Sequence, residues 1–227
     1  MTEESNSQDF AALRARMVAE VDATYADTAR ETGLAAMSPA VRAALGKVER
    51  HRLVPAAQVP LAYRNHPLPI GGGQTISQPD IVALSTDLLQ INSNSNVLDV
   101  GTGSGYQAAV LAEIASRVHS IEIIAALGRE AKQRLDDLGY RNIEIRIGDG
   151  YQGWAEKGPF DGIVVTAAAP SVPPALVAQL KAGGRMVIPL GATGDVQLLK
   201  LVTRRADGGY DEKTVLPVRF VPLVPGK

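Results

Sequence analysis

Residues 96–106, with the sequence NVLDVGTGSGY, constrain this chain more than any other stretch. The apolar residues up to Val100 predict a buried strand, the glycines at 101, 103 and 105 predict a tight turn, and the residues after them predict a helix. A glycine-rich turn between a strand and a helix is typical of a loop that binds a nucleotide cofactor. The alternative is a turn without a ligand, but three glycines at a strand end would weaken the fold without a compensating role.

The spacing of the glycines indicates which cofactor the loop holds. A dinucleotide fingerprint needs a third glycine where this chain has Tyr106, so a nicotinamide-dependent dehydrogenase is disfavoured. The pattern present from Asp99 to Gly105 is D-x-G-x-G-x-G. This pattern resembles motif I of S-adenosylmethionine-dependent methyltransferases.

Strand and helix patterns alternate after this loop, which requires a parallel sheet with helices on both faces. Residues 196–203 and 214–224 then predict two strands joined by a turn at 207–209, which is typical of an antiparallel hairpin. We therefore expect an α/β protein with a Rossmann-like, doubly wound, mostly parallel sheet and a C-terminal antiparallel hairpin. The alternating elements are helices over 106–115 and 124–138 and strands over 118–123, 143–147, 160–166 and 185–190, with a further helix begun by Pro173 and Pro174.

The N-terminal part predicts helices. Residues 9–33 have apolar side chains at helical spacing between an aspartate cap and a glycine, and residues 38–55 predict a second helix begun by a serine cap and a proline. Residues 1–8 are expected to be disordered. The domain organisation expected is an N-terminal helical extension over 1–54 and a methyltransferase domain over 55–227, together forming one compact unit.

Residues 55–76 predict an ordered loop, because four prolines and three successive glycines are unsuited to a helix or a central strand. The next apolar residues have helical spacing, so a helix begins at Ser77 or Gln78. Backbone N–H groups that are free at such a point favour an anion. The pattern equally allows Ser77 to do no more than cap its own helix.

Two carboxylates follow predicted strands at the edge where the glycine loop lies. Glu122 comes 17 residues after Gly105 and can accept hydrogen bonds from both hydroxyls of a ribose, although a solvent-facing charge is the alternative. Asp149 lies between two glycines and can reach an adenine amino group, or it belongs to a plain turn. The small residues at 167–169 leave room for a cleft.

The composition excludes several classes of function. The 23 basic and 24 acidic residues give a net charge of −1 and no field that would hold nucleic acid or an anionic membrane. There is no cysteine, and the three histidines lack ligand-like spacing, so no metal site is expected. No apolar run is long enough to span a membrane, and the first residues are polar and acidic, so we expect a soluble cytoplasmic protein.

Seven blocks of sequence carry a resemblance to one family. The chain from about residue 53 to 224 resembles the protein-L-isoaspartate O-methyltransferase family. Asp80 departs from that family, which usually has a histidine or an aromatic residue there, and the first 50 residues match it only loosely. The blocks are LPIGGGQTISQP (68–79), VLDVGTGSGYQAAVLA (97–112), SIE (120–122), GDG (148–150), PFDGIVVTAAAP (159–170), LKAGGRMVIPLG (180–191) and VRFVPL (218–223).

The resemblance implies repair of damaged proteins and peptides by a monomer. The methyl group of S-adenosyl-L-methionine passes to the free α-carboxyl of an L-isoaspartyl residue, S-adenosyl-L-homocysteine remains, and the ester collapses through a succinimide, partly to normal aspartate. The resemblance makes Ser77 the catalytic residue and Thr75, Ser77, Ala168 and Arg219 the substrate-binding residues. It assigns the cofactor to Gln74, Thr75, Ile76, Ser77, Asp99, Gly101, Thr102, Gly103, Ser104, Glu122, Asp149, Gly150 and Gln197.

Two other functions fit the same residues. The first is a methyltransferase that uses the same cofactor on another peptide or a small acid. The second is a module that binds the cofactor or isoaspartyl peptides without turnover. The acceptor carboxylate has a pKa of about 3.5 and is ionised at neutral pH, so neither a histidine nor a cysteine base is needed.

Overall fold

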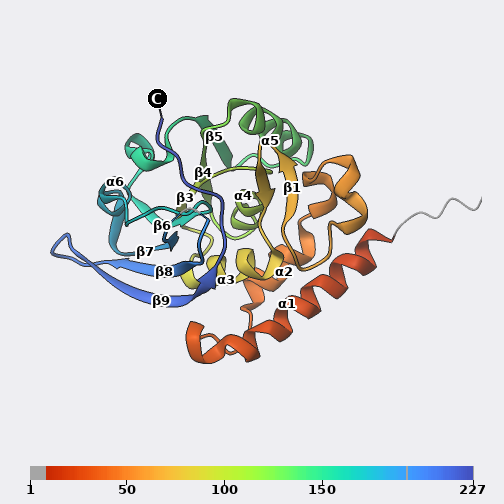
Figure 1. Cartoon of the computed structure of the whole chain (residues 1–227), viewed down its shortest axis with the longest axis horizontal. Coiled ribbons are helices and arrows are strands. Elements are labelled where there is room, and N and C mark those ends of the chain that lie inside the picture. Colours follow the sequence, from red (N-terminus) through yellow and green to blue (C-terminus); the bar gives the residue numbers. More distant parts are fainter. Residues whose placement is uncertain (1–8, 193, 227) are drawn as a thin grey trace, which may run out of the picture.

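The computed structural model describes residues 9–192 and 194–226, and the disorder expected for residues 1–8 lies outside this part. A seven-stranded sheet with the order β5-β4-β3-β6-β7-β8-β9 forms the centre (Figure 1). The strands from β5 to β7 pair in parallel, whereas β8 pairs antiparallel with both of its neighbours. The strands are β3 (Asn96–Val100), β4 (Arg117–Glu122), β5 (Ile143–Ile147), β6 (Phe160–Val165), β7 (Leu180–Leu190), β8 (Gln197–Arg204) and β9 (Tyr210–Val218).

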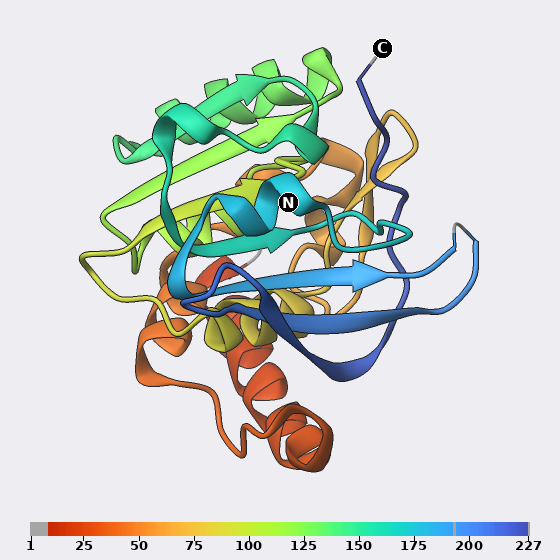
Figure 2. The same ribbon diagram turned by 90° about the vertical axis from the view of Figure 1, so that its left-hand side faces the viewer.

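Helices cover both faces of this sheet. In β3, Val97 packs in one buried cluster with Leu88 and Leu111, and the next residue, Leu98, packs in another with Leu176. Successive side chains of a strand point to opposite faces, so these clusters are the two layers of the core. Figure 2 shows α6 in front of the sheet. The expected α/β fold is confirmed. One layer contains α3 (Pro79–Leu89), α4 (Tyr106–Ala112) and α5 (Ala125–Asp137). The other contains α6 (Pro174–Ala178) and two 3-10 turns that precede it in the chain, η3 (Gly150–Gln152) and η4 (Ala155–Lys157).

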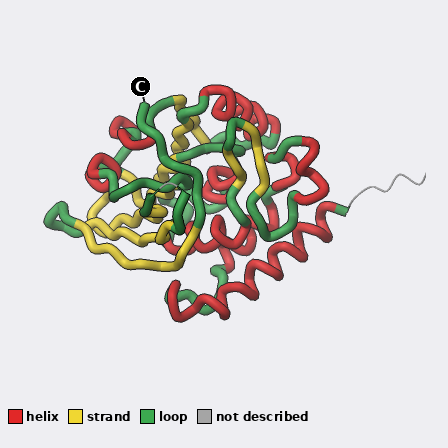
Figure 3. Tube along the Cα trace, viewed as in Figure 1, coloured by secondary structure: helices red, strands yellow, loops and turns green. Residues whose placement is uncertain are grey.

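Two helices lie at the N-terminal end of the described chain (Figure 3). Both begin where the sequence predicts. In α1 (Phe10–Thr32) the Asp9 carboxylate accepts a hydrogen bond from the Ala12 N–H at 3.0 Å, and Gly33 ends the helix at a φ of 81°. The helix α2 (Pro39–Lys47) ends earlier than predicted, and a 3-10 helix, η1 (Arg50–Leu53), replaces its last turns. No helix in the described residues is long and apolar enough to cross a membrane.

The prediction of a loop over residues 55–76 was wrong for much of this range. It contains the 3-10 helix η2 (Ala56–Leu61) and an antiparallel hairpin of β1 (Leu68–Gly71) and β2 (Gln74–Ile76). The glycines at 71–73 all have positive φ angles, which allows the tight reversal between the strands. Proline is tolerated in β1 because a two-stranded sheet has only edge strands.

The C-terminal part also differs from its predicted boundaries. The strand β7 begins at Leu180 rather than at the predicted residue 185, because the stretch before it continues the strand with only an irregularity in its pairing with β6, and β9 ends at Val218 rather than at 224. Residues 219–224 instead run as a separate segment beside Ala168, whose N–H donates to the Val221 carbonyl and whose carbonyl accepts from the Leu223 N–H, both at 2.8 Å.

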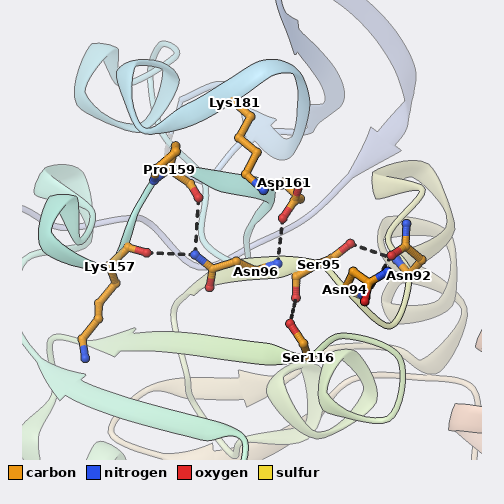
Figure 4. A network of polar contacts seen from close by, with 9 residues as sticks. All are labelled: Asn92, Asn94, Ser95, Asn96, Ser116, Lys157, Pro159, Asp161 and Lys181. Atoms are coloured by element: carbon orange, nitrogen blue, oxygen red, sulfur yellow. Dashed lines mark hydrogen bonds and ion pairs between the residues drawn. The ribbon is translucent and has the colours of Figure 1, made fainter.

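The polar turn before β3 anchors the start of that strand (Figure 4). The Asn96 N–H donates to Asp161 at 2.8 Å, and its side-chain amide donates to the carbonyls of Lys157 and Pro159. The hydroxyl of Ser116 donates to the Ser95 carbonyl at 2.8 Å. These contacts tie the beginning of β3 to its neighbours, so its other end presents the glycine loop at a fixed place.

Candidate functional site

The glycine loop lies where the order of the parallel strands reverses, between β3 and β6. Ligands of open α/β sheets bind in the crevice at this point. Gly101, Gly103 and Gly105 have φ angles of 102°, 53° and 88°, which side chains rarely adopt. A Cβ on Gly101 would also lie 2.4 Å from the hydroxyl of Thr166, and one on Gly105 would lie 2.9 Å from Leu135. Both positions therefore require glycine, and the backbone of the loop stays open toward the crevice.

Glu122, at the end of β4, holds this loop. Its Oε2 accepts a hydrogen bond from the Gly103 N–H at 2.7 Å, and its Oε1 accepts one from the Ile124 N–H at 2.9 Å. The side chain is 5% exposed and lines a cavity beside the loop. Each carboxylate oxygen has a second lone pair, so Glu122 can still accept bonds from two neighbouring hydroxyls of a ligand.

Asp99 lies behind the loop and does not line the cavity. It is fully buried, its Oδ2 accepts from Ser120 at 2.7 Å, and the Ser120 hydroxyl lies 2.6 Å from that of Thr102. Because Ser120 donates to the carboxyl, Thr102 donates to Ser120, and the three side chains form a chain that ends in the loop. Burial raises the pKa of Asp99 to about 7. The Asp99 Oδ1 has no hydrogen-bond partner among the described residues.

Thr166 is a site residue that the sequence reasoning missed. It follows β6, and its hydroxyl donates to the carbonyls of Gly101 at 2.7 Å and Val100 at 3.1 Å. The parallel pairing of β3 with β6 places it there, opposite the glycine loop. The only local signal was its position at the end of a predicted buried strand, directly before the three alanines.

Two neighbouring cavities meet at the hairpin β1–β2. The second, of about 650 Å³, opens beside the first between the beginning of α3 and the segment after β9. Thr75, Ser77, Thr166 and Val221 line both cavities. The first cavity is also lined by the predicted cofactor residues Gln74, Ile76, Gly101, Thr102, Gly103, Ser104, Glu122 and Gly150, and by Val82, Val100, Tyr106, Gln107, Ile121, Ile123, Ile124, Ala167, Pro222, Leu223 and Val224.

The expectation of free N–H groups at the start of α3 was wrong. Pro79 has no N–H, the Asp80 N–H donates to Asn65 at 3.1 Å, and the Ile81 N–H donates to the Asp80 carboxylate at 2.6 Å. Ser77 does not cap the helix either, because the N-cap is Gln78 and makes no side-chain cap. The Ser77 hydroxyl makes no hydrogen bond within the described part of the chain, so it is available to a ligand.

Four predicted site residues lie outside the cavity walls. The Asp149 carboxylate accepts from the Tyr151 N–H at 2.8 Å, while the neighbouring Gly150 lines the first cavity. Gln197 is buried and joins the Ala192 carbonyl to the Phe220 N–H. Ala168 holds the segment 219–224 through its backbone, and Asp99 lies behind the glycine loop, as described above. Arg219 lines the second cavity only.

The residues that line the first cavity fit a nucleoside. The only charged side chain in its lining is Glu122, which suits a pair of ribose hydroxyls. Isoleucines at 121, 123 and 124 offer an apolar wall for a base, and the bare backbone of the glycine loop allows close approach. No group of three or more metal-binding side chains occurs in the described ranges.

Comparison with known proteins gives consistent matches over most of the chain. The family model for protein-L-isoaspartate(D-aspartate) O-methyltransferase matches residues 24–227. The chain is 57% identical over 207 residues to protein-L-isoaspartate O-methyltransferase 2 of Polaromonas sp., covering 91% of this chain and 98% of that protein. It is 56% identical over 218 residues to protein-L-isoaspartate O-methyltransferase 1 of Nitrosospira multiformis, covering 96% of this chain and 89% of that protein.

Solved structures show the same architecture. One protein-L-isoaspartate O-methyltransferase superposes with a TM-score of 0.80 at 26% identity over 92% of this chain, and this chain spans 65% of its length. A Plasmodium falciparum protein of the same description, solved in complex with S-adenosyl-L-homocysteine, superposes with a TM-score of 0.71 at 25% identity, covering 89% of this chain and 98% of that chain. The residues matched by the family model, 24–227, include every residue that lines the two cavities.

Proposed function

Because the chain belongs to the protein-L-isoaspartate(D-aspartate) O-methyltransferase family, we propose that its methyl transfer takes place where the two cavities meet, at Ser77 and Thr166. The enzyme transfers the methyl group of S-adenosyl-L-methionine to the free α-carboxyl of L-isoaspartyl residues in damaged proteins and peptides. The observation that carries the proposed location is that these side chains line both cavities. A methyl donor in the first cavity would then face an acceptor in the second.

The residues at this junction suit a reaction that needs no general base. An α-carboxyl is already ionised at neutral pH, so the protein has only to orient its oxygen toward the methyl carbon and exclude water. The free hydroxyl of Ser77 donates to one carboxylate oxygen and leaves the other to attack, and Thr75 adds backbone contacts. Arg219, in the wall of the second cavity, attracts the carboxylate. Positioning of this kind supplies several kcal/mol to catalysis.

The residues assigned to the cofactor divide into those that contact the cofactor directly and those that act through other residues. We assign direct contacts to the hairpin residues 74–77, the glycine loop 101–104, Glu122 and Gly150, because all line the first cavity. Asp99 does not line this cavity and acts on the glycine loop through Ser120 and Thr102. The chemistry that the cofactor supplies is its activated methyl group.

Three of the remaining residues position the segment 219–224 and its surroundings. Gln197 bonds the Phe220 N–H at 2.8 Å, and Ala168 bonds the backbone of Val221 and Leu223. This segment supplies Val221 to both cavities, so Gln197 and Ala168 shape the junction without lining it. Asp149 holds the turn that presents Gly150 to the first cavity.

We further propose that the enzyme works as a monomer in the cytoplasm. Every residue to which we assign a role belongs to this one chain, so the proposed reaction uses no residue of a partner. The absence of cysteine fits a reducing compartment. Gel filtration with light scattering measures the mass directly, and a dimer would contradict the first part.

Transfer of labelled methyl to an isoaspartyl peptide and to its aspartyl twin tests the function. We expect label in the isoaspartyl peptide alone, and equal labelling of both would refute repair. Cofactor binding by calorimetry without any methyl ester would favour a binding module instead. Label in other carboxylates but not in the isoaspartyl peptide would identify a different carboxyl methyltransferase.

A further inference from the structure

The second cavity contains one acidic and one basic side chain, on different segments of its wall. Of the fifteen residues that line it, only Asp80 and Arg219 are ionisable. Asp80 comes from the first turn of α3, and Arg219 comes from the segment that follows β9. Neither makes an ion pair with another described residue, although ion pairs occur elsewhere on the chain.

The Asp80 carboxylate is held firmly in place. Its Oδ2 accepts from the side chain of Gln78 at 2.9 Å, and its Oδ1 accepts from the Ile81 N–H at 2.6 Å. Its own N–H donates to Asn65. The residue is half-buried, and burial raises the pKa of Asp80 above its ordinary value. These contacts fix the charge at one point but supply no counter-charge, so a cation from outside would be stabilised there.

The position of Asp80 also reverses the ordinary preference of a helix N-terminus. Backbone N–H groups at such a point normally favour an anion. Here the N–H groups of Asp80 and Ile81 are already occupied, and the carboxylate itself stands at the start of α3. An acidic group of a ligand would therefore meet a like charge on this wall, whereas Arg219 remains for the isoaspartyl carboxylate.

We propose that Asp80 is a specificity-determining residue that selects isoaspartyl peptides with a basic residue next to the isoaspartyl position. This inference rests on the proposed function. It assigns the carboxylate end of the substrate to Ser77 and Arg219 and the neighbouring cationic side chain to Asp80. A peptide with an acidic neighbour would place its carboxylate near Asp80 and bind less well.

The test uses isoaspartyl peptides that differ only in carrying Lys, Ala or Glu beside the isoaspartyl residue, on either side. At low salt, we expect the wild-type kcat/KM for the Lys peptide to exceed that for the Glu peptide on the order of fivefold. This difference should occur with the variable residue on at least one of the two sides of the isoaspartyl residue. Asp80→Asn, which keeps an acceptor for the Ile81 N–H, should abolish or reverse this ratio, and Asp80→Glu should retain it. Glu130→Gln is the matched control, because it removes an exposed charge on α5, a helix that contributes no residue to the second cavity, and should leave the ratio unchanged.

Several outcomes would overturn the inference. Equal wild-type rates for the Lys and Glu peptides would do so, as would a ratio that persists in Asp80→Asn. Added salt should lower the wild-type ratio, and this measurement decides the question even if the Asn variant does not fold, because an unchanged ratio excludes a charge effect. Failure of the wild-type enzyme to methylate any isoaspartyl peptide would instead refute the proposed function, and this inference with it.

Discussion

Replacing Glu122 by alanine tests how the cofactor loop is held and how it binds. In the folded protein, the carboxylate accepts from the N–H groups of Gly103 at 2.7 Å and Ile124 at 2.9 Å and lines the first cavity. The alanine variant loses both bonds to the protein and also the bonds proposed to the ribose. The first loss lowers the free energy of unfolding, and the second lowers cofactor affinity.

The magnitudes follow from the number and type of bonds. A hydrogen bond to a charged group contributes about 1.5–3 kcal/mol, and part of this is regained because water can reach the cavity side of the loop. We therefore expect the free energy of unfolding to fall by about 2–3 kcal/mol. Cofactor binding should weaken by about 1–3 kcal/mol, which corresponds to a dissociation constant raised roughly 5- to 150-fold. Glu122→Gln keeps one acceptor oxygen and should lie between wild type and alanine in both measurements.

Isothermal calorimetry with S-adenosyl-L-homocysteine measures the affinity, and urea unfolding of the free protein measures the stability. Glu130→Ala is the control, because Glu130 lies on α5 and its one ion pair among the described residues is with Arg134, one turn away. An unchanged dissociation constant in Glu122→Ala would remove Glu122 from the cofactor site. Weaker binding with unchanged stability would contradict its role in holding the loop.

Three further substitutions test other parts of the site. Ser77→Ala should lower kcat roughly 10- to 100-fold while the dissociation constant of the cofactor stays nearly constant, and a parallel loss of both would make Ser77 a binding residue only. Burial raises the pKa of Asp99 from 3.8 to about 7, so the folded protein holds a proton that the unfolded chain releases above pH 4, and stability falls as pH rises through this window. Asp99→Asn lacks this titrating group. The difference between its free energy of unfolding and that of the wild type, both measured in urea, should therefore rise on the order of 1 kcal/mol per pH unit between pH 5 and 7. A difference that does not change with pH would contradict the raised pKa of Asp99. Gly101→Ala would combine a φ of 102° with a Cβ only 2.4 Å from the Thr166 hydroxyl, whereas Gly139→Ala has a similar φ of 86° but open space around the new Cβ. Thermal unfolding should therefore show a clearly larger loss of stability for Gly101→Ala, and equal losses of stability would exclude the clash.

The central elements could be predicted because their signals are local. The strand, turn and helix of NVLDVGTGSGY depend on residues next to one another, and β3 and α4 follow as expected. The hairpin β1–β2 was missed because it depends on the pairing of Leu68 with Ile76 across a stretch rich in proline and glycine. Its two short strands pair only with each other, so the alternation typical of a sheet face is too brief to detect.

The parts of the site that were missed depend on long-range pairing. Thr166 reaches Gly101 only because β6 pairs with β3, and no spacing in the sequence joins these two residues. The free N–H groups expected at the start of α3 are occupied by Asn65 and by Asp80 itself. The acidic residue in the first turn of that helix was a local signal for this, because a carboxylate there satisfies the same donors that an anionic ligand would use.

The distribution of charge over the two cavities follows from the reaction. Methyl transfer consumes one anion and one cation, so strong stabilisation of both reactants would raise the barrier. The four residues that line both cavities carry no charge. Asp99 lies behind the glycine loop and is neutral below about pH 7, and both oxygens of Glu122 already face backbone N–H groups. Asp80 and Arg219 line only the second cavity. Charged side chains therefore line the second cavity, which selects and orients the substrate. None lines the junction of the two cavities, where methyl transfer removes the charges of both reactants.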